Sequence, residues 1–188
     1  MVILGIADNH DAGAALVVDN ELVAACGQER IDRVKNSGAF PWGAIDAVLD
    51  KAGLRARDVD RVVVGSSFTP SFLLRRFPSF HHDRRKEGGQ FSPLLNAYVV
   101  YQVGLRKSGL WMEEVERCKR LLTARLRERG FRSAQVTMME HHLAHAHAAY
   151  RCQGRSKALI LTVDAMGDGV SCTANIGRWG QLDRHWEQ

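Results

Sequence analysis

Four of the eight histidines of this chain lie within seven residues, at positions 141, 142, 145 and 147. On a helix, His141 and His145 are one turn apart on the same face, so both imidazoles can reach one metal ion. Glu140 precedes the pair and no glutamate stands between its members, which excludes the HExxH pattern of metalloproteases. The spacing favours a metal site, and a partly exposed histidine-rich helix is the alternative. His142 and His147 lie off that face and are either substrate contacts or surface residues.

Asp164 is the natural third ligand. It follows an apolar strand predicted at residues 158–163, where side chains emerge at the edge of a sheet, and a glycine-containing turn comes next. Two histidines and one carboxylate suit Fe(II), Mn(II) or Zn(II) and leave coordination positions open for substrate oxygens. A turn-forming aspartate is the alternative interpretation of Asp164. It is the preferred interpretation of Asp168, which stands between two glycines.

Two further polar groups lie near the N-terminus. His10 and Asp11 occupy the turn of a predicted first hairpin, a place where exposed backbone amides can hold a phosphate or acyl group. Polar residues in a turn need no functional explanation, so this signal is weak by itself. Arg30, followed by Arg33 and Lys35, is either part of an anion-binding edge or part of an ordinary charged rim, and the rim is slightly favoured.

The elements that must position these residues follow from hydrophobic periodicity and turn signals. Three short apolar runs separated by polar turns predict two consecutive hairpins. Pro41 and Gly53 bound a predicted helix, and a second, strongly amphipathic helix ends at Gly130. The expected fold class is α/β, a mixed sheet with antiparallel first strands and packed helices. The predicted strands are residues 2–7, 14–18, 22–26, 62–64, 134–139, 158–163 and 170–176; the helices are 42–52, 111–129 and 141–150; an irregular insertion with short helices is expected at 68–110, and 177–188 resemble the middle of another hairpin.

Composition sets the class of protein. The chain has 188 residues, 45% of them hydrophobic and 25% charged, which excludes collagen-like, disordered and coiled-coil proteins. No apolar run approaches the roughly 20 residues that span a bilayer, and the N-terminus does not resemble a signal peptide, so no membrane partner is expected. The four cysteines are far apart and form no CxxC pair. Their spacing argues against a zinc ribbon or a disulfide scaffold and favours a reducing cytoplasm.

The net charge of +5 is unevenly distributed. Residues 71–132 carry fourteen Lys and Arg against six Asp and Glu. Such a segment could meet nucleic acid or an anionic substrate, but a solvated helix face is the preferred explanation. No RNA-binding aromatic motif or zinc finger accompanies the charge, which argues against nucleic acid as a partner.

Four motifs in this order resemble those of the antibiotic and Nod-factor O-carbamoyltransferases. Together they extend over nearly all of the chain outside residues 68–110, and the combination is specific where each alone is not. They are His10-Asp11-x-Gly-Ala-Ala-Leu-Val, then Gln28-Glu29-Arg30 with Arg33, Lys35 and Phe40-Pro41, then His141-His142-Leu143-Ala144-His145-Ala146, and finally Leu161-Thr162-Val163-Asp164-Ala165-Met166-Gly167-Asp168-Gly169.

The resemblance implies an actin/hexokinase-like (ASKHA) fold and a division of labour between two domains. A YrdC-like domain makes carbamoyl adenylate from carbamoyl phosphate and ATP, and the ASKHA-like domain transfers the carbamoyl group to a hydroxyl of a small-molecule or sugar acceptor. His141, His145 and Asp164 would hold the divalent metal, with Fe(II) favoured over Mn or Zn. His10 and Asp11 would lie near the transferred group as catalytic residues.

His142 and Arg30 are the expected substrate contacts. The resemblance also implies parts that these 188 residues do not contain, namely the second ASKHA lobe and the YrdC-like domain, in the same or a separate chain. We therefore expect residues 1–188 to be the N-terminal lobe of the transferase domain and to lack full activity alone. The alternatives are a tRNA threonylcarbamoylation-type protein of the same fold and a non-catalytic metal-binding remnant.

Overall fold

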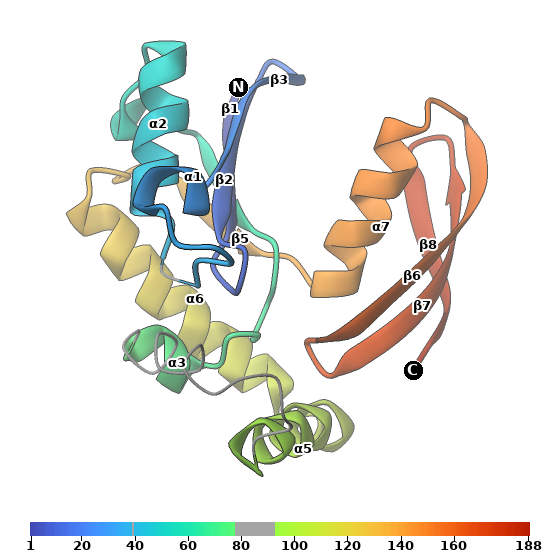
Figure 1. Cartoon of the computed structure of the whole chain (residues 1–188). Helices are drawn as coiled ribbons and strands as arrows, with labels where there is room; N and C mark the ends of the chain where they lie inside the picture. The colour runs from blue at the N-terminus through green and yellow to red at the C-terminus, as the bar shows by residue number, and fades with distance from the viewer. Residues whose placement is uncertain (39, 78–92) are drawn as a thin grey trace.

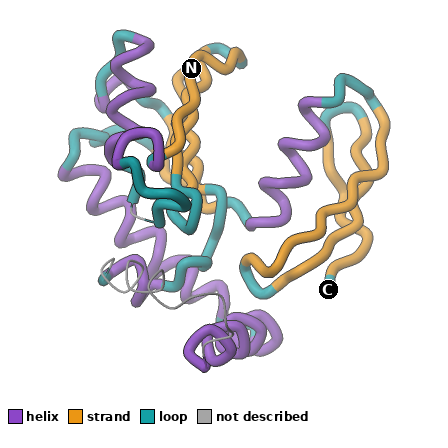
Figure 2. The backbone as a smooth tube through the Cα atoms, viewed as in Figure 1, coloured by secondary structure: helices purple, strands orange, loops and turns teal. Residues whose placement is uncertain are grey.

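Two separate β-sheets organise the chain in a computed structural model that describes residues 1–38, 40–77 and 93–188 (Figures 1 and 2). The first sheet has the strand order β3-β2-β1-β4-β5 and the second the order β6-β7-β8. β1 pairs antiparallel with β2 and β2 with β3, while β1, β4 and β5 run parallel. The strands are β1 (Val2–Ala7), β2 (Gly13–Val18), β3 (Glu21–Gly27), β4 (Arg61–Val64), β5 (Gln135–Met138), β6 (Lys157–Gly167), β7 (Val170–Arg178) and β8 (Gln181–Glu187).

The main core lies between the five-stranded sheet and two helices on one of its faces (Figure 1). Strand register aligns the buried residues Leu16, Leu4, Val62 and Val136 in one row across four strands. Because side chains alternate along a strand, this row and its neighbours all face the helices. Buried residues of α2 (Trp42–Ala52) and α6 (Trp111–Glu128) complete the core: Ala44, Ile45, Val48, Leu49, Leu122 and Leu126.

The predicted helix at 42–52 and the first strand are confirmed at their bounds, and most other elements agree within two residues. Gly53 ends α2 in the left-handed conformation, with φ of 67°. Two short elements were not predicted: α1 (Glu29–Asp32) and the 3-10 helix η1 (Ala56–Asp58). Each has fewer than five residues, too few for a periodic signal. The last predicted segment forms β8, so the expected hairpin is confirmed.

The expected mixed sheet with antiparallel first strands is confirmed in β1 to β5, and the last three strands form a second sheet that the sequence did not predict. β6 pairs with β7 and β7 with β8, and none of these three strands pairs with β5. Helix α7 (His141–Cys152) packs on this second sheet through Ala146, Tyr150 and Ile160. A strand that follows a helix can return to the same sheet or begin another, and short hairpin turns here favour pairing among the last three strands.

The expectation of short helices within residues 68–110 is partly wrong. α3 (Phe72–Arg76) is short, but α5 (Pro93–Ser108) has 16 residues. Proline at the first helical position removes no intrahelical hydrogen bond, so Pro93 begins this helix and does not interrupt it. Residues 78–92 lie outside the described part of the chain. None of the helices in the described ranges is long and apolar enough to cross a membrane.

The buried thiol of Cys118 should resist alkylation. Burial raises its pKa to about 11, against the opposing effect of the nearby Arg75 guanidinium. At pH 8 a thiol with such a pKa is only about 0.1% thiolate, and the thiolate is the nucleophile. Cys152 at the end of α7 is exposed. We expect iodoacetamide to label Cys152 at least about 100-fold faster than Cys118, as followed by mass spectrometry of peptides. Equal rates in the folded protein would contradict the position of Cys118.

Candidate metal centre

The N-cap of helix α7 is Glu140, so the helix begins at His141. The Glu140 side chain caps the helix by accepting a hydrogen bond from the Leu143 amide at 2.7 Å. A carboxylate at this end also interacts favourably with the helix dipole. Arg184 from β8 donates to the same carboxylate. The first residue of the helix is then His141, and His145 follows one turn later on the same face.

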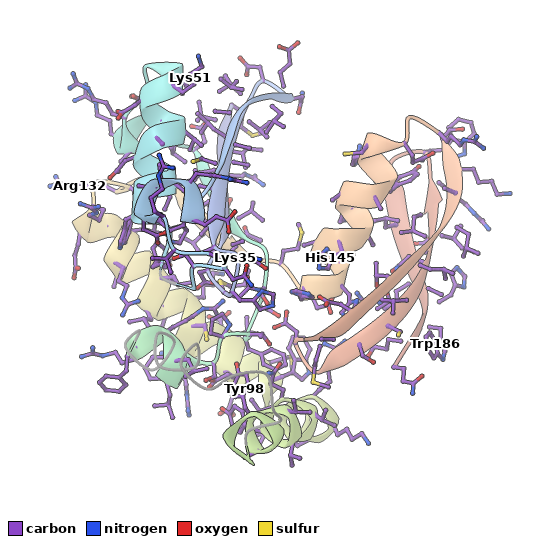
Figure 3. The ribbon with its side chains drawn as sticks, in the orientation of Figure 1. Lys35, Lys51, Tyr98, Arg132, His145 and Trp186 are labelled. Atoms are coloured by element: carbon purple, nitrogen blue, oxygen red, sulfur yellow. The ribbon has the colours of Figure 1, made fainter. Side chains whose placement is uncertain are left out.

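Three side chains converge at the end of α7 that faces β6. Nε2 of His141 lies 2.8 Å from Oδ2 of Asp164 and 3.1 Å from Nε2 of His145. Nε2 of His145 lies 3.5 Å from the same Asp164 oxygen. The His141 side chain is nearly buried, whereas those of His145 and Asp164 are about half exposed and 38% exposed. Figure 3 shows His145 on α7, in the region between the two sheets.

This triangle of donor atoms has the size that a divalent transition metal requires. Ligand bonds of about 2.1 Å that meet at right angles separate the donor atoms by about 3.0 Å. The observed separations of 2.8, 3.1 and 3.5 Å bracket that value. The hydrogen bond from His141 lowers the pKa of Asp164, and burial opposes this shift. The carboxylate therefore stays ionised and can act as a ligand, so the residues fit a two-histidine, one-carboxylate centre.

Gly167 is required beside His141. A Cβ built at Gly167 would lie 2.2 Å from two ring carbons of His141, far inside van der Waals contact. β6 is irregular between Val163 and Gly167, where its pairing with β7 shifts. Asp164 continues the alternation of Ile160 and Thr162, which face α7, and within the irregular stretch the Gly167 backbone lies against the imidazole. Gly167, which the sequence indicated only as part of a turn, thus leaves the space that the His141 ring occupies.

His142 lies in the interior of the structure. Its side chain is fully buried, and its two ring nitrogens contact Thr162 Oγ1 at 2.7 Å and the Val170 carbonyl at 2.9 Å. Since a carbonyl only accepts, Nε2 donates and Nδ1 accepts from the threonine. Burial lowers the pKa of His142, so the ring is neutral. These two hydrogen bonds join α7 to the second sheet, and the predicted substrate contact of His142 stays a prediction.

His10, Asp11 and Arg30 lie outside the triangle. Nδ1 of His10 contacts Asp11 Oδ2 at 2.8 Å, and both side chains are exposed. Arg30 is exposed on α1 and lies 3.5 Å from Glu29. In the described parts of the chain, none of the three forms a hydrogen bond or ion pair with His141, His145 or Asp164. Their predicted roles remain predictions.

The structure also reveals a buried ion pair that no sequence pattern indicated. Asp8, just after β1, accepts two hydrogen bonds from Arg75 of α3, at 2.7 and 2.9 Å. Both side chains are almost fully buried, and Arg75 also donates to the carbonyls of Ser66 and Ser67. Burial by itself would lower the pKa of Arg75, but attraction to Asp8 outweighs it and the pKa is raised. Sixty-seven residues separate the partners, so no local signal exists.

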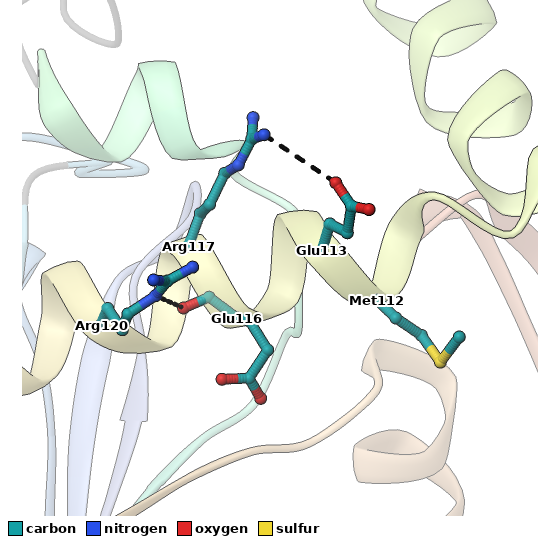
Figure 4. A pocket seen from close by; sticks show the side chains of 5 residues that line it. All are labelled: Met112, Glu113, Glu116, Arg117 and Arg120. Atoms are coloured by element: carbon teal, nitrogen blue, oxygen red, sulfur yellow. Dashed lines mark hydrogen bonds and ion pairs between the residues drawn. The ribbon is translucent and has the colours of Figure 1, made fainter.

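The basic segment forms no obvious anion site where it is described. A shallow pocket on the outer face of α6 is lined by residues of both signs, with Glu113 3.9 Å from Arg117 (Figure 4). Arg120 donates to the Glu116 carbonyl at 3.3 Å. All the lining residues belong to α6, and none belongs to the histidine cluster: Met112, Glu113, Glu116, Arg117 and Arg120. This agrees with a solvated helix face.

Comparison with known proteins shows which family this chain resembles in sequence. The model of the family described as "Carbamoyltransferase N-terminus" matches residues 2–187. The chain is 31% identical over 195 residues to uncharacterized protein sll1178 of Synechocystis sp., covering 98% of this chain and 29% of that protein. It is 27% identical over 170 residues to nodulation protein NolNO of Sinorhizobium fredii, covering 89% of this chain and 21% of that protein.

Solved structures resemble the chain more distantly. YeaZ from Pseudomonas aeruginosa aligns with all of this chain and 66% of the YeaZ chain, at 13% identity and a TM-score of 0.49.

The fold and the histidine–aspartate cluster define a mixed α/β protein with a candidate metal centre. The match over residues 2–187 shows that the chain belongs to the carbamoyltransferase N-terminus family, which confirms the resemblance inferred from the motifs. Strands β1 to β5 form the expected mixed sheet with antiparallel first strands, and the actin/hexokinase-like lobe stays a prediction from the resemblance. The chain spans less than a third of the length of the curated relatives it matches.

Proposed function

We propose that this chain is the metal-binding part of an O-carbamoyltransferase, which moves a carbamoyl group from carbamoyl adenylate to an acceptor hydroxyl. The observation that carries the proposal is the triangle of His141, His145 and Asp164 within a chain that the family model matches almost end to end. Two of its three side chains are accessible, so substrate oxygens can approach from solvent. ATP and carbamoyl phosphate are the co-substrates of the complete enzyme in this proposal.

His141, His145 and Asp164 would hold the ion, Fe(II) in preference to Mn(II) or Zn(II). When bound, the metal would supply Lewis-acid polarisation of a carbonyl oxygen or of the acceptor hydroxyl. Carbamoyl transfer also requires the acceptor hydroxyl to lose its proton as its oxygen attacks the carbamoyl carbon, and AMP leaves with the electrons of the bond that breaks. His10 suits this task because Asp11 engages its Nδ1, which leaves Nε2 free to take the proton. Arg30 is exposed and could attract an anionic group of the substrate.

The outer face of the second sheet supports the proposal that further lobes pack here. Leu159, Leu161 and Val163 of β6 are 65–80% exposed, and Trp186 of β8 is 50% exposed. Leu161 pairs with Ala174 and Ala174 with Trp186, so the three residues lie on one face of the sheet. Figure 3 shows Trp186 on the side of this sheet away from α7. An apolar face of this kind marks an interaction surface. Since the Synechocystis and Sinorhizobium relatives are more than three times longer, we assign it to the second ASKHA lobe, in the same or a separate chain.

The same proposal places the enzyme in a reducing cytoplasm. All four cysteines are free, including Cys152 at the end of α7, Cys172 in β7 and Cys26 in the first sheet. Free thiols in exposed or half-buried positions persist where disulfides are not formed.

Radiolabelled carbamoyl phosphate tests the proposed function. The complete gene product, supplied with ATP, Fe(II) and a panel of sugar and small-molecule hydroxyl acceptors, is expected to form labelled product. The 188 residues alone are expected to form none, because the adenylate-forming domain is absent. Product from the 188 residues alone would contradict the division into domains. A complete protein that instead carbamoylates no hydroxyl but binds tRNA in a salt-sensitive gel shift would favour the tRNA-modifying alternative.

A further inference from the structure

Asp168 is the most highly connected polar side chain among the described residues. It lies in the turn between β6 and β7 and is fully buried. Its Oδ2 accepts hydrogen bonds from the Ser67 amide, the Ser67 hydroxyl and the His141 amide, at 2.8, 2.8 and 2.9 Å. Its Oδ1 accepts from the amides of Phe68 and Thr69 at 2.8 and 2.9 Å. The expected turn residue is therefore also an acceptor for five donors.

These donors come from two segments that are far from Asp168 in sequence. Residues 67–69 follow β4 of the first sheet, and His141 is the first residue of α7. The return contact is a hydrogen bond from the Asp168 amide to Thr69 Oγ1, at 2.9 Å. Arg106 reaches only the backbone carbonyl of Asp168, at 3.5 Å. Five N–H and O–H donors, and no cation in hydrogen-bond contact in the described structure, therefore stabilise this buried carboxylate.

The position of Asp168 links it to two members of the metal triangle. It holds the backbone of His141 directly through the amide hydrogen bond. It also stands four residues after Asp164 in the same strand-and-turn unit, next to the Gly167 backbone that packs against the His141 ring. Loss of the carboxylate would release the start of α7 from the β6–β7 turn and would leave the amides of residues 67–69 without their acceptor.

We propose that Asp168 is a positioning residue of the metal centre, whose carboxylate holds the first turn of α7 at the separation from Asp164 that metal binding requires. The inference rests on the proposed metal site and goes beyond it, because Asp168 is not itself a ligand. A purely structural aspartate would contribute to stability without affecting the metal. The two roles differ in what happens to metal affinity in a variant that still folds.

Co²⁺ alone is the probe, added to the 188-residue chain and followed by calorimetry and by its visible absorption spectrum. Asp168→Asn keeps the size of the side chain but places an amide donor against N–H donors. We expect the variant to bind Co²⁺ about 10- to 100-fold more weakly, with an altered absorption band. Val48→Ala is the matched control: it destabilises the core on α2, remote from the triangle, and should leave affinity and spectrum unchanged.

Wild-type affinity and spectrum in folded Asp168→Asn would overturn the inference, as would an equal loss in Val48→Ala. If Asp168→Asn fails to fold, Ser67→Ala removes one of the five donors and leaves the backbone donors in place. It should weaken Co²⁺ binding several-fold, and unchanged affinity would then overturn the inference. Asp164→Ala reports separately on the proposed function: if it binds Co²⁺ as tightly as the wild type, the metal site itself is wrong.

Discussion

His145→Ala is expected to lose specific divalent-metal binding while it keeps its fold. His145 supplies one of three donor atoms, and its side chain is about half exposed, so truncation leaves no large cavity. Loss of a residue that merely orients a ligand costs about 10- to 100-fold in affinity, and loss of a ligand should cost more than about 100-fold. Titration with Co²⁺ or Fe(II), together with far-UV circular dichroism, measures both properties.

His147→Ala is the control for this experiment. His147 lies on the same helix two residues later, is half-buried, and forms no part of the triangle. Burial and the nearby Arg151 lower its pKa, so it is neutral, as a metal-binding imidazole would be. If the helix binds metal only through its general richness in histidine, both variants should lose a similar part of their affinity. Unchanged metal affinity in His145→Ala would refute the assignment of the ligands.

Arg75→Ala is expected to lower the free energy of unfolding by about 3–5 kcal/mol. The side chains of Arg75 and Asp8 are 1% and 2% exposed, so the variant leaves an unpaired carboxylate in the interior. It also removes the donors to the carbonyls of Ser66 and Ser67. Chemical denaturation of the two proteins measures the difference. A loss below about 1 kcal/mol would mean that water reaches Asp8 and that the pair is not buried.

Arg76→Ala is the matched control because the neighbouring arginine is exposed, with its guanidinium 5.2 Å from the centre of the Phe77 ring. Its truncation should change the stability by less than about 0.5 kcal/mol. Arg75→Met combined with Asp8→Leu removes both charges and should recover much of the stability lost in Arg75→Ala. Failure of this double variant to recover any stability would show that the hydrogen bonds of Arg75 to the loop carbonyls matter more than the charges.

Helix α7 shows how far local pattern carries the prediction of the site. The four-residue spacing of His141 and His145 predicted a shared helix face, and the structure places their Nε2 atoms 3.1 Å apart. The same periodicity placed His142 off that face. It did not indicate whether His142 is exposed to solvent or packed on a sheet, because periodicity within a helix does not show which other element packs against each of its faces. Thr162 and Val170 of the second sheet occupy that side.

Spacing and periodicity determined the parts of this protein that depend on neighbours within a few residues. They were sufficient for the strands, for most of the helices, for the pair of histidines and for Asp164 at the end of an apolar strand. Only the tertiary structure decided the separation of the second sheet, the ion pair of Asp8 with Arg75, and the contact of Asp168 with Ser67 across about one hundred residues. Such contacts arise when packed elements bring distant polar groups together out of water, where each must find a partner, and no repeat in the sequence records which partner that is.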